Sequence, residues 1–183
     1  SSLSPEQLDA MLDTIVSVSS ELLRQELPHT LLYDGMLREI ADMAELEQAG
    51  KLKAVITQNI DNLHQMAGSK KVLELHGSVY RNHCVKCGKS YDFKYMKESE
   101  GVPKCTCGGI IKPDVVLYEE GLDQETIEKS VKYIANADVL IIGGTSLTVY
   151  PAAGLIDYYR GHKLVLINKS VTPMDNRADL VIS

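Results

Sequence analysis

Several features that would place a protein in another class are missing from this sequence of 183 residues. No apolar run approaches the roughly 20 residues that cross a membrane, and the first residues show no basic-then-apolar signal pattern. Lysine and arginine are scattered, and acidic residues outnumber them 25 to 19, which argues against nucleic acid as the main partner. No cysteine lies outside positions 84–107, which suits a reducing compartment. We therefore expect a cytoplasmic protein without membrane or direct nucleic-acid binding.

The composition that remains is that of an ordinary globular protein. With 44% hydrophobic and 24% charged residues, the chain can form one domain, or one domain with a small insertion. Its net charge of −6 would suit a basic, lysine-bearing partner. Nothing in the sequence indicates an oligomeric state.

Two short apolar runs each end abruptly in polar side chains. These are Gln58, Asn59 and Asp61 after the run at 53–57, and His76 after the run at 72–75. Parallel strands present such residues together at one edge of an α/β sheet, where ligands bind. His76 suits a general base, because imidazole titrates near neutral pH and the small residues after it allow close approach. A single histidine after a strand is more often structural, so this interpretation depends on the whole group.

The four cysteines form two close pairs, Cys84 with Cys87 and Cys105 with Cys107. This spacing is typical of a zinc ribbon, in which each pair lies on a tight turn and four thiolates complete a tetrahedral site. A redox pair, unmetallated thiols, or His83 as a substitute ligand are the alternatives. Because a four-sulfur site leaves no position for water, we expect a structural Zn²⁺ that takes no part in chemistry.

The order of apolar segments predicts an α/β fold with a doubly wound parallel (Rossmann-like) sheet and an inserted zinc-ribbon module. Strands are expected near 53–57, 114–118, 138–143, 163–167 and 179–182, with an amphipathic helix at 123–135. Helical spacing dominates the first fifty residues, and Gly50 is a natural helix end. We divide the chain into a helical segment at 1–52, a Rossmann-like domain at 53–83 and 110–183, and a zinc-ribbon module at 84–109.

Two later strand ends also carry polar or small residues. The strand at 138–143 runs into Gly144, Thr145 and Ser146, and the strand at 163–167 runs into Asn168. A strand, a turn of small residues and a helix start together form an anion or ribose site. Asn168 can hydrogen-bond a ribose.

Four short segments of the sequence resemble, in order and spacing, the signature of the sirtuin (Sir2-like) NAD-dependent protein deacylases of bacterial type. They read Gln58-Asn59-Ile60-Asp61, Leu63-His64-Gln65, Ala67-Gly68-Ser69 and Glu74-Leu75-His76-Gly77-Ser78, and the resemblance covers roughly residues 44–182. It implies that acyl-lysine attacks the nicotinamide ribose of NAD, nicotinamide leaves, and the acyl group passes to ADP-ribose. His76 would be the general base on a ribose hydroxyl. Asn59 and Asp61 would position the ribose and nicotinamide amide, and Gln58 would hold the ribose.

The same resemblance implies roles for residues further along the chain. Gly144, Thr145 and Ser146 would contact the adenosine side of NAD. The main chain of Val115 and Val116, with the ring of Tyr118, would flank an acyl-lysine protein or peptide, by main-chain bonding of the β-augmentation type. Tyr118 and Glu119 stand where the family usually has Phe and Gly, which affects the expected peptide preference.

The sequence also departs from the family before residue 53. Sirtuins open with a strand, a Gly-Ala-Gly-x-Ser loop and a segment carrying Asp-Phe-Arg, and none of these is present. Glycine-rich loops cradle pyrophosphate through backbone N–H groups, whereas Asp34-Gly35 offers a single glycine. We expect a fragment, a rearranged chain or a degenerate relative with weaker NAD binding, and unpaired neighbours where the missing strand would lie. The alternative functions are NAD-dependent ADP-ribosyl transfer, NAD or ADP-ribose binding without turnover, and a structural interaction module.

Overall fold

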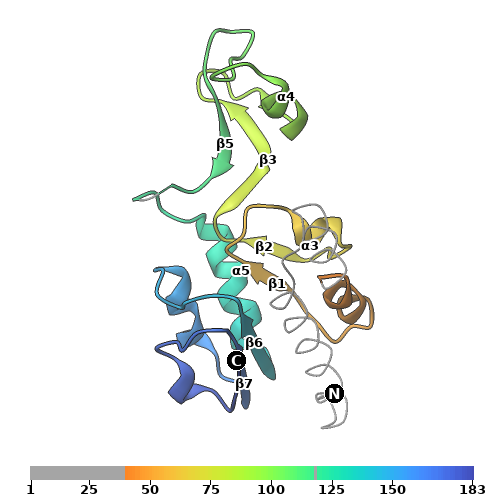
Figure 1. The fold of residues 1–183 in the computed structure, drawn as a ribbon, viewed down its shortest axis with the longest axis vertical. Coiled ribbons are helices and arrows are strands. Elements are labelled where there is room, and N and C mark those ends of the chain that lie inside the picture. Colours follow the sequence, from red (N-terminus) through yellow and green to blue (C-terminus); the bar gives the residue numbers. More distant parts are fainter. Residues whose placement is uncertain (1–39, 118) are drawn as a thin grey trace.

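The computed structural model describes residues 40–117 and 119–183 (Figure 1). The helices expected before residue 40 and the side chain of Tyr118 therefore lie outside the described residues. No helix in the described part is long and apolar enough to cross a membrane. The first described element is a helical segment at residues 40–48, and the chain leaves it at Gly50 with φ 72°, as the sequence predicts.

This helix is tied to the first pair of strands. The carboxylate of Glu47 accepts hydrogen bonds of 2.9 Å from the backbone N–H groups of Lys70 and Lys71. Those residues lead directly into β2 (Val72–Glu74), which pairs in parallel with β1 (Val55–Thr57). The short helix α3 (Leu63–Met66) lies in the connection between these two strands.

A second parallel sheet is formed by β6 (Val139–Gly143), β7 (Lys163–Ile167) and β8 (Leu180–Ile182), with β7 in the middle. Strand β7 is buried on both faces, which explains its unbroken apolar sequence. Leu164 and Leu166 pack with Ile156 on one face, and Val165 packs with Val139 on the other. The 3₁₀ helices η1 (Ala152–Tyr158) and η2 (Asp175–Arg177) lie in the two connections of this sheet.

The helix α5 (Gln124–Ala135) joins the two parallel sheets through packing. Asp123 begins it by accepting a 2.8 Å hydrogen bond from the N–H of Thr126, so the predicted helix at 123–135 is confirmed. The buried Ile134 packs with Leu75, and the same apolar cluster includes Ile56 and Leu140. Residues beside both sheets therefore share one core.

The two parallel sheets are separate in their hydrogen bonding, whereas the sequence predicts one continuous sheet. Within the described part of the chain, the outer edges of β1 and β6 pair with no other strand. The expectation of unpaired neighbours where sirtuins have their first strand, ahead of the glycine-rich loop, stays a prediction. The backbone groups on those edges point away from their own sheets, as in any edge strand.

A third sheet is antiparallel and carries the cysteines. It contains β4 (Ser90–Tyr91), β3 (Gly77–Cys84) and β5 (Ile111–Val115) in that order, and the helix α4 (Phe93–Glu98) follows β4. In Figure 1 this sheet extends away from the parallel strands, with α4 at its far end.

The prediction that a strand near 114–118 joins the parallel sheet is therefore wrong. Strand β5 ends at Val115 and pairs with β3 in antiparallel register. Pro113 gives the physical reason, because proline lacks the N–H that a central strand needs and is tolerated at a sheet edge. In the order β4-β3-β5, strand β5 is such an edge. The division into three segments stays a prediction.

Candidate functional site

The imidazole of His76 lies between the ends of β1 and β2. Its Nδ1 is 3.0 Å from the backbone carbonyl oxygen of Gln58. A carbonyl oxygen only accepts, so Nδ1 must carry the proton, and a neutral His76 then keeps the lone pair on Nε2. The Leu75 N–H donates to the Thr57 carbonyl at 2.9 Å and holds the two strand ends together. A half-buried imidazole anchored in this way can accept a proton at Nε2.

The polar residues after β1 are fixed by their own backbone contacts. The N–H of exposed Asn59 donates to the Thr57 hydroxyl at 3.0 Å. Asp61 accepts a 3.0 Å bond from the N–H of Leu63, the first residue of α3. These contacts order the loop and leave the Asn59 amide on the surface, where it can meet a ligand.

The end of β6 meets the end of β1 directly. The hydroxyl of Thr145 donates to the side-chain oxygen of Gln58 at 3.1 Å. Before it, Gly144 turns the chain with φ 65°, and its N–H donates to the Ile167 carbonyl at 3.0 Å. Ser146 is exposed on the same turn, and its hydroxyl lies 2.7 Å from that of Thr148. The structure thus brings together residues that the sequence places far apart.

We call this group the strand-end cluster. It consists of Gln58, Asn59, Asp61, His76, Gly144, Thr145 and Ser146. It offers an imidazole, two amides, a carboxylate and two hydroxyls, a donor set suited to ribose and amide groups. Asn168 also follows the carboxyl end of a strand, β7, but its side-chain N–H donates to the Ser170 carbonyl at 3.0 Å, within its own loop. Its predicted ribose contact stays a prediction.

The edge of β5 lies against the histidine. The N–H of Val116 donates to the His76 carbonyl at 3.1 Å, and Val115 pairs with Gly77. Gly77 has φ 75°, and a Cβ on it would lie 1.9 Å from the carbonyl oxygen of Asp114. Only glycine allows β5 to approach this closely.

The N–H of Glu120 donates to the carbonyl of Leu117 at 3.1 Å, and Glu119 lies in this turn. Glu119 has φ 72°, a conformation that favours glycine, so the departure from the family noted in the sequence carries backbone strain. Glu120 supports the turn by accepting a 2.9 Å hydrogen bond from the N–H of Leu117. The assigned peptide contacts of Val115, Val116 and Tyr118 stay predictions.

The four cysteine sulfurs come together at the far end of the antiparallel sheet. Their Sγ atoms all lie within 4.8 Å of one another, with 3.5 Å between Cys84 and Cys107 and 3.6 Å between Cys87 and Cys105. Zn–S bonds of about 2.3 Å in a tetrahedron place sulfurs just under about 4 Å apart, so this arrangement fits a structural zinc ion. His83 is not part of this group.

The surroundings shift the thiol pKa values in different directions. They lower the pKa of Cys84 and of Cys105, whereas at Cys107 the hydrogen bond with the backbone at Gly109 is outweighed by contacts with the other sulfurs, which raise its pKa to about 12. The hydrogen bond with the backbone at Cys107, followed by that with the Tyr91 phenol, lowers the pKa of Cys105 to about 5. The Tyr91 hydroxyl lies 3.0 Å from the Cys105 sulfur. Gly109 leaves room for the sulfurs, since a Cβ there would be 2.6 Å from Cys84 Sγ. Thiolate is the form that binds metal, so the surroundings of Cys84 and Cys105 suit the ribbon predicted from the spacing.

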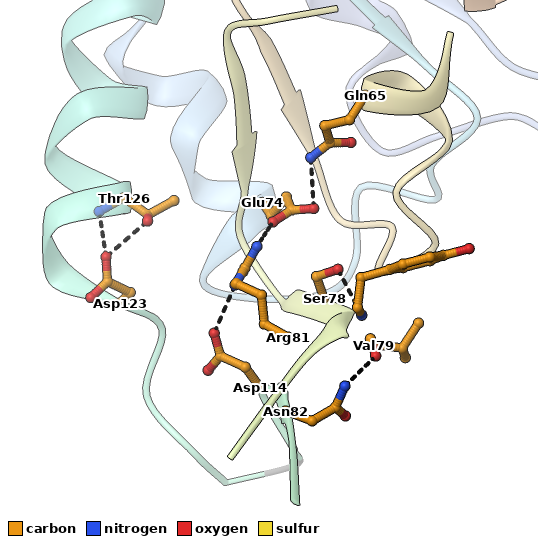
Figure 2. A network of polar contacts seen from close by, with 10 residues as sticks. Gln65, Glu74, Ser78, Val79, Arg81, Asn82, Asp114, Asp123 and Thr126 are labelled. Carbon is orange, nitrogen blue, oxygen red and sulfur yellow. Dashed lines mark hydrogen bonds and ion pairs between the residues drawn. The ribbon is translucent and has the colours of Figure 1, made fainter. Parts of the chain in front are cut away.

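The sequence did not predict a polar network that lies close to His76 and Val116. It links Gln65, Glu74, Arg81 and Asp114 (Figure 2). The alternation of charged and apolar residues did not indicate on which face of the strand Arg81 lies, because Arg81 is in an irregular part of β3.

Comparison with known proteins supports the resemblance. The sequence model of the Sir2 family matches residues 21–151. The chain is 66% identical over 143 residues to an NAD-dependent protein deacetylase of Clostridium acetobutylicum, covering 77% of this chain and 58% of that protein. It is 68% identical over 143 residues to one of Clostridium perfringens, covering 77% of this chain and 59% of that protein. The chain thus spans less than two thirds of these relatives.

Solved structures show the same fold. A Sir2 complex with p53 peptide and NAD⁺ matches with a TM-score of 0.73 and 43% identity, over 80% of this chain and 63% of that one. A Sir2 complex with the inhibitor EX-527, 2′-O-acetyl-ADP-ribose and deacetylated p53 peptide matches with a TM-score of 0.74 and 42% identity, over 80% and 64%. The predicted Rossmann-like α/β fold with a zinc-ribbon module is confirmed. The chain belongs to the Sir2 family, the sirtuins.

Proposed function

We propose that this chain carries the base, ribose and peptide-binding elements of an NAD-dependent protein lysine deacylase. The observation that carries the proposal is the placement of His76. Its imidazole is anchored through Nδ1 to the Gln58 carbonyl, and its own carbonyl binds the N–H of Val116. One residue thus touches both the nucleotide side and the peptide side of the site. The relatives named NAD-dependent protein deacetylase support this reading.

NAD supplies the ADP-ribose that receives the acyl group and the nicotinamide that leaves. His76 takes a proton from a ribose hydroxyl at Nε2, and its Nδ1–H stays bonded to the Gln58 carbonyl and stabilises the charged ring. Asn59 and Asp61 orient the ribose and the nicotinamide amide. Gln58, held by Thr145, completes this side of the site.

The peptide binds along the end of β5 in this proposal. Strand β5 is an edge of its sheet, so a peptide in extended conformation can add to it through main-chain hydrogen bonds. This mode requires the acyl-lysine backbone and few particular side chains. A Zn²⁺ ion held by the four cysteines would fix the far end of the same sheet and would take no part in the chemistry.

A second candidate is an NAD- or ADP-ribose-binding relative with little turnover. The observation that favours it is the open edge of β1 and of β6 among the described residues. In this candidate, the ribose groups are held by the strand-end cluster, and none of the described residues forms a glycine-rich loop for the pyrophosphate.

The test is a turnover assay on the zinc-loaded chain with an acetyl-lysine peptide and NAD. Mass spectrometry would quantify three products, the deacetylated peptide, nicotinamide and acetyl-ADP-ribose. If the deacylase proposal is right, they form in equal amounts. His76→Ala should reduce all three by about 10²- to 10⁴-fold, the usual contribution of a general base. His162→Ala, an exposed histidine, is the control.

Two other results would point elsewhere. ADP-ribosylated protein without deacetylated peptide would show ADP-ribosyl transfer. Calorimetric binding of NAD without any product would support the second candidate, and no binding of NAD or peptide would overturn both.

A further inference from the structure

Strand β3 contains an irregularity that redirects one arginine. Ser78 pairs with Asp114 and Asn82 pairs with Pro113, so the three residues at 79–81 have no counterpart on β5. Such a bulge bends the strand and changes where its side chains point. The bulge is well supported, since the Asn82 side chain donates to the Val79 carbonyl at 3.0 Å. Asn82 is 3% exposed and Ser78 is fully buried, so this irregularity is a fixed part of the fold.

Arg81, at the end of this bulge, binds two carboxylates on two different strands. Its Nη1 donates to Glu74 at 2.6 Å and its Nε donates to Asp114 at 3.1 Å (Figure 2). The other Glu74 oxygen accepts a 2.8 Å bond from the side chain of Gln65. We call these four residues the Arg81 cluster. A guanidinium suits this task, because its planar fork can donate in two directions at once.

Burial makes the Glu74 contact the stronger part of the cluster. The Glu74 side chain is 8% exposed, whereas those of Arg81 and Asp114 are 54% and 55% exposed. A carboxylate this far from water requires a charged partner. The hydrogen bonds with Glu74 and Asp114 outweigh desolvation and raise the pKa of Arg81, so the guanidinium stays charged.

The two carboxylates belong to the segments that meet at the proposed site. Glu74 ends β2 and lies two positions before His76, and Asp114 lies two positions before Val116. The N–H of Val116 donates to the His76 carbonyl, so the two segments also touch beyond the Arg81 cluster. Arg81 therefore links the segment that contains His76 to the segment that contains Val116. It belongs to neither of these two segments.

We propose that Arg81 is a positioning residue that sets the distance between His76 and the Val116 edge where the acyl-lysine backbone binds. The consequence for peptide binding rests on the proposed function. The coupling of the two segments does not, because it concerns the Val116–His76 hydrogen bond alone. Arg81 need touch neither NAD nor peptide to act in this way.

The first test measures that hydrogen bond directly. Amide hydrogen exchange at Val116, followed by NMR on the zinc-loaded chain, should be at least about tenfold faster in Arg81→Met than in the unaltered protein. Arg177→Met is the matched control, since Arg177 also pairs with an exposed carboxylate, Asp157, but on η1 and η2. Exchange in that control should stay within about twofold. No acceleration in Arg81→Met would overturn the proposal.

A double variant separates positioning from general destabilisation. Arg81→Met alone leaves the buried Glu74 carboxylate unpaired, which lowers stability whatever the role of Arg81. Glu74→Gln/Arg81→Met removes that charge, so the midpoint of thermal unfolding should recover while Val116 exchange stays fast. Recovery of both would mean that Arg81 only neutralises Glu74, and the proposal would be wrong. Arg81→Lys keeps the charge without the fork and should give intermediate exchange.

The second test measures peptide affinity. An acetyl-lysine peptide should bind about tenfold more weakly to Arg81→Met and to the double variant, with NAD affinity changed less than about twofold. An equal loss for both ligands would contradict a role at the peptide edge. If the unaltered protein binds no peptide, the proposed function fails, and the Val116 exchange still decides whether Arg81 couples the two segments.

Discussion

The zinc ribbon and the strand-end cluster depend on the sequence in opposite ways. The four cysteines come from one stretch, 84–107, and tight turns bring their sulfurs within 4.8 Å. In the strand-end cluster, Gln58 and Thr145 are bonded although 87 positions separate them. Local turns assemble the first site, and the packing of two parallel sheets around α5 assembles the second. We therefore expect the two regions to fail separately.

Removal of zinc should have the largest effect and tests the independence of the two regions most directly. Structural zinc contributes on the order of 10 kcal/mol of apparent binding free energy in zinc-finger peptides, so chelation or Cys105→Ser should unfold the ribbon. Hydrogen exchange should show lost protection in β3 and β5, with β6, β7 and β8 still protected.

Thr106→Ser is the control for this prediction, because the residue is exposed and lies between two ligands. Zinc content measured by elemental analysis should stay at one per chain in that variant. Loss of protection in β7 on chelation would show that the two regions are not independent.

Gly77→Ala tests the contact between β5 and the segment that contains His76, and it should have the next largest effect. A Cβ at Gly77 would lie 1.9 Å from the Asp114 carbonyl oxygen, so β5 must move away from His76. We expect a loss of about 2–4 kcal/mol in the free energy of unfolding, of the size found for overpacking combined with strain at positive φ. Bound zinc should be retained. Urea unfolding and zinc content are the measurements.

Gly101→Ala is a matched control for that change. Gly101 has φ 67°, but a Cβ there would meet nothing within 4 Å. It therefore experiences the backbone strain alone, about 1 kcal/mol. Equal losses in the two variants would mean that the close approach of β5 does not matter.

Thr145→Val tests the strand-end cluster alone and should have a smaller effect. It removes the hydroxyl that donates to Gln58 and keeps the shape of the side chain. A single neutral hydrogen bond is worth about 0.5–1.5 kcal/mol, so NAD should bind roughly two- to tenfold more weakly by calorimetry. Thr145→Ser keeps the donor and should bind NAD normally. A stronger effect of Ser than of Val would contradict the assigned contact.

The sequence was most informative where the chemistry is local. The cysteine pairs, the strand ends at Gln58 and His76, and the α5 helix all follow from neighbouring residues. The predicted strand near 114–118 was wrong because periodicity shows an extended segment and not its partner. Only the pairing with β3 shows that Pro113 lies on an edge.

The Arg81 cluster was missed for a related reason. A bulge of three residues changes which face a side chain lies on, and no propensity marks its position in ELHGSVYRNHC. Glu74 shows no sign of burial in the sequence either, although its side chain is only 8% exposed. Such features depend on tertiary contacts, so a single sequence does not predict them.

The smallest expected effect concerns the pH dependence of stability through His64, which lies in α3 near Asp61. Burial lowers the pKa of His64, against an opposing effect of the Asp61 charge, and its Nδ1 is buried without a hydrogen-bond partner among the described residues. In the unfolded chain a histidine titrates near about 6.5. Above that pH both states are neutral and stability is unaffected. As the pH falls below it, the unfolded chain binds a proton that the folded protein does not, so the free energy of unfolding decreases.

His64→Asn removes this titration and should flatten the decrease in stability between about pH 7 and pH 5, as measured by urea unfolding. The comparison uses the slope with pH, because the substitution also changes packing. His162→Gln, at an exposed position, should leave the slope as it is. His64 lies outside the zinc ribbon. The protection of β3 and β5 against hydrogen exchange should therefore stay constant over the same pH range in zinc-loaded protein. An unchanged slope in His64→Asn would show that acid destabilises the strand-end region through other groups.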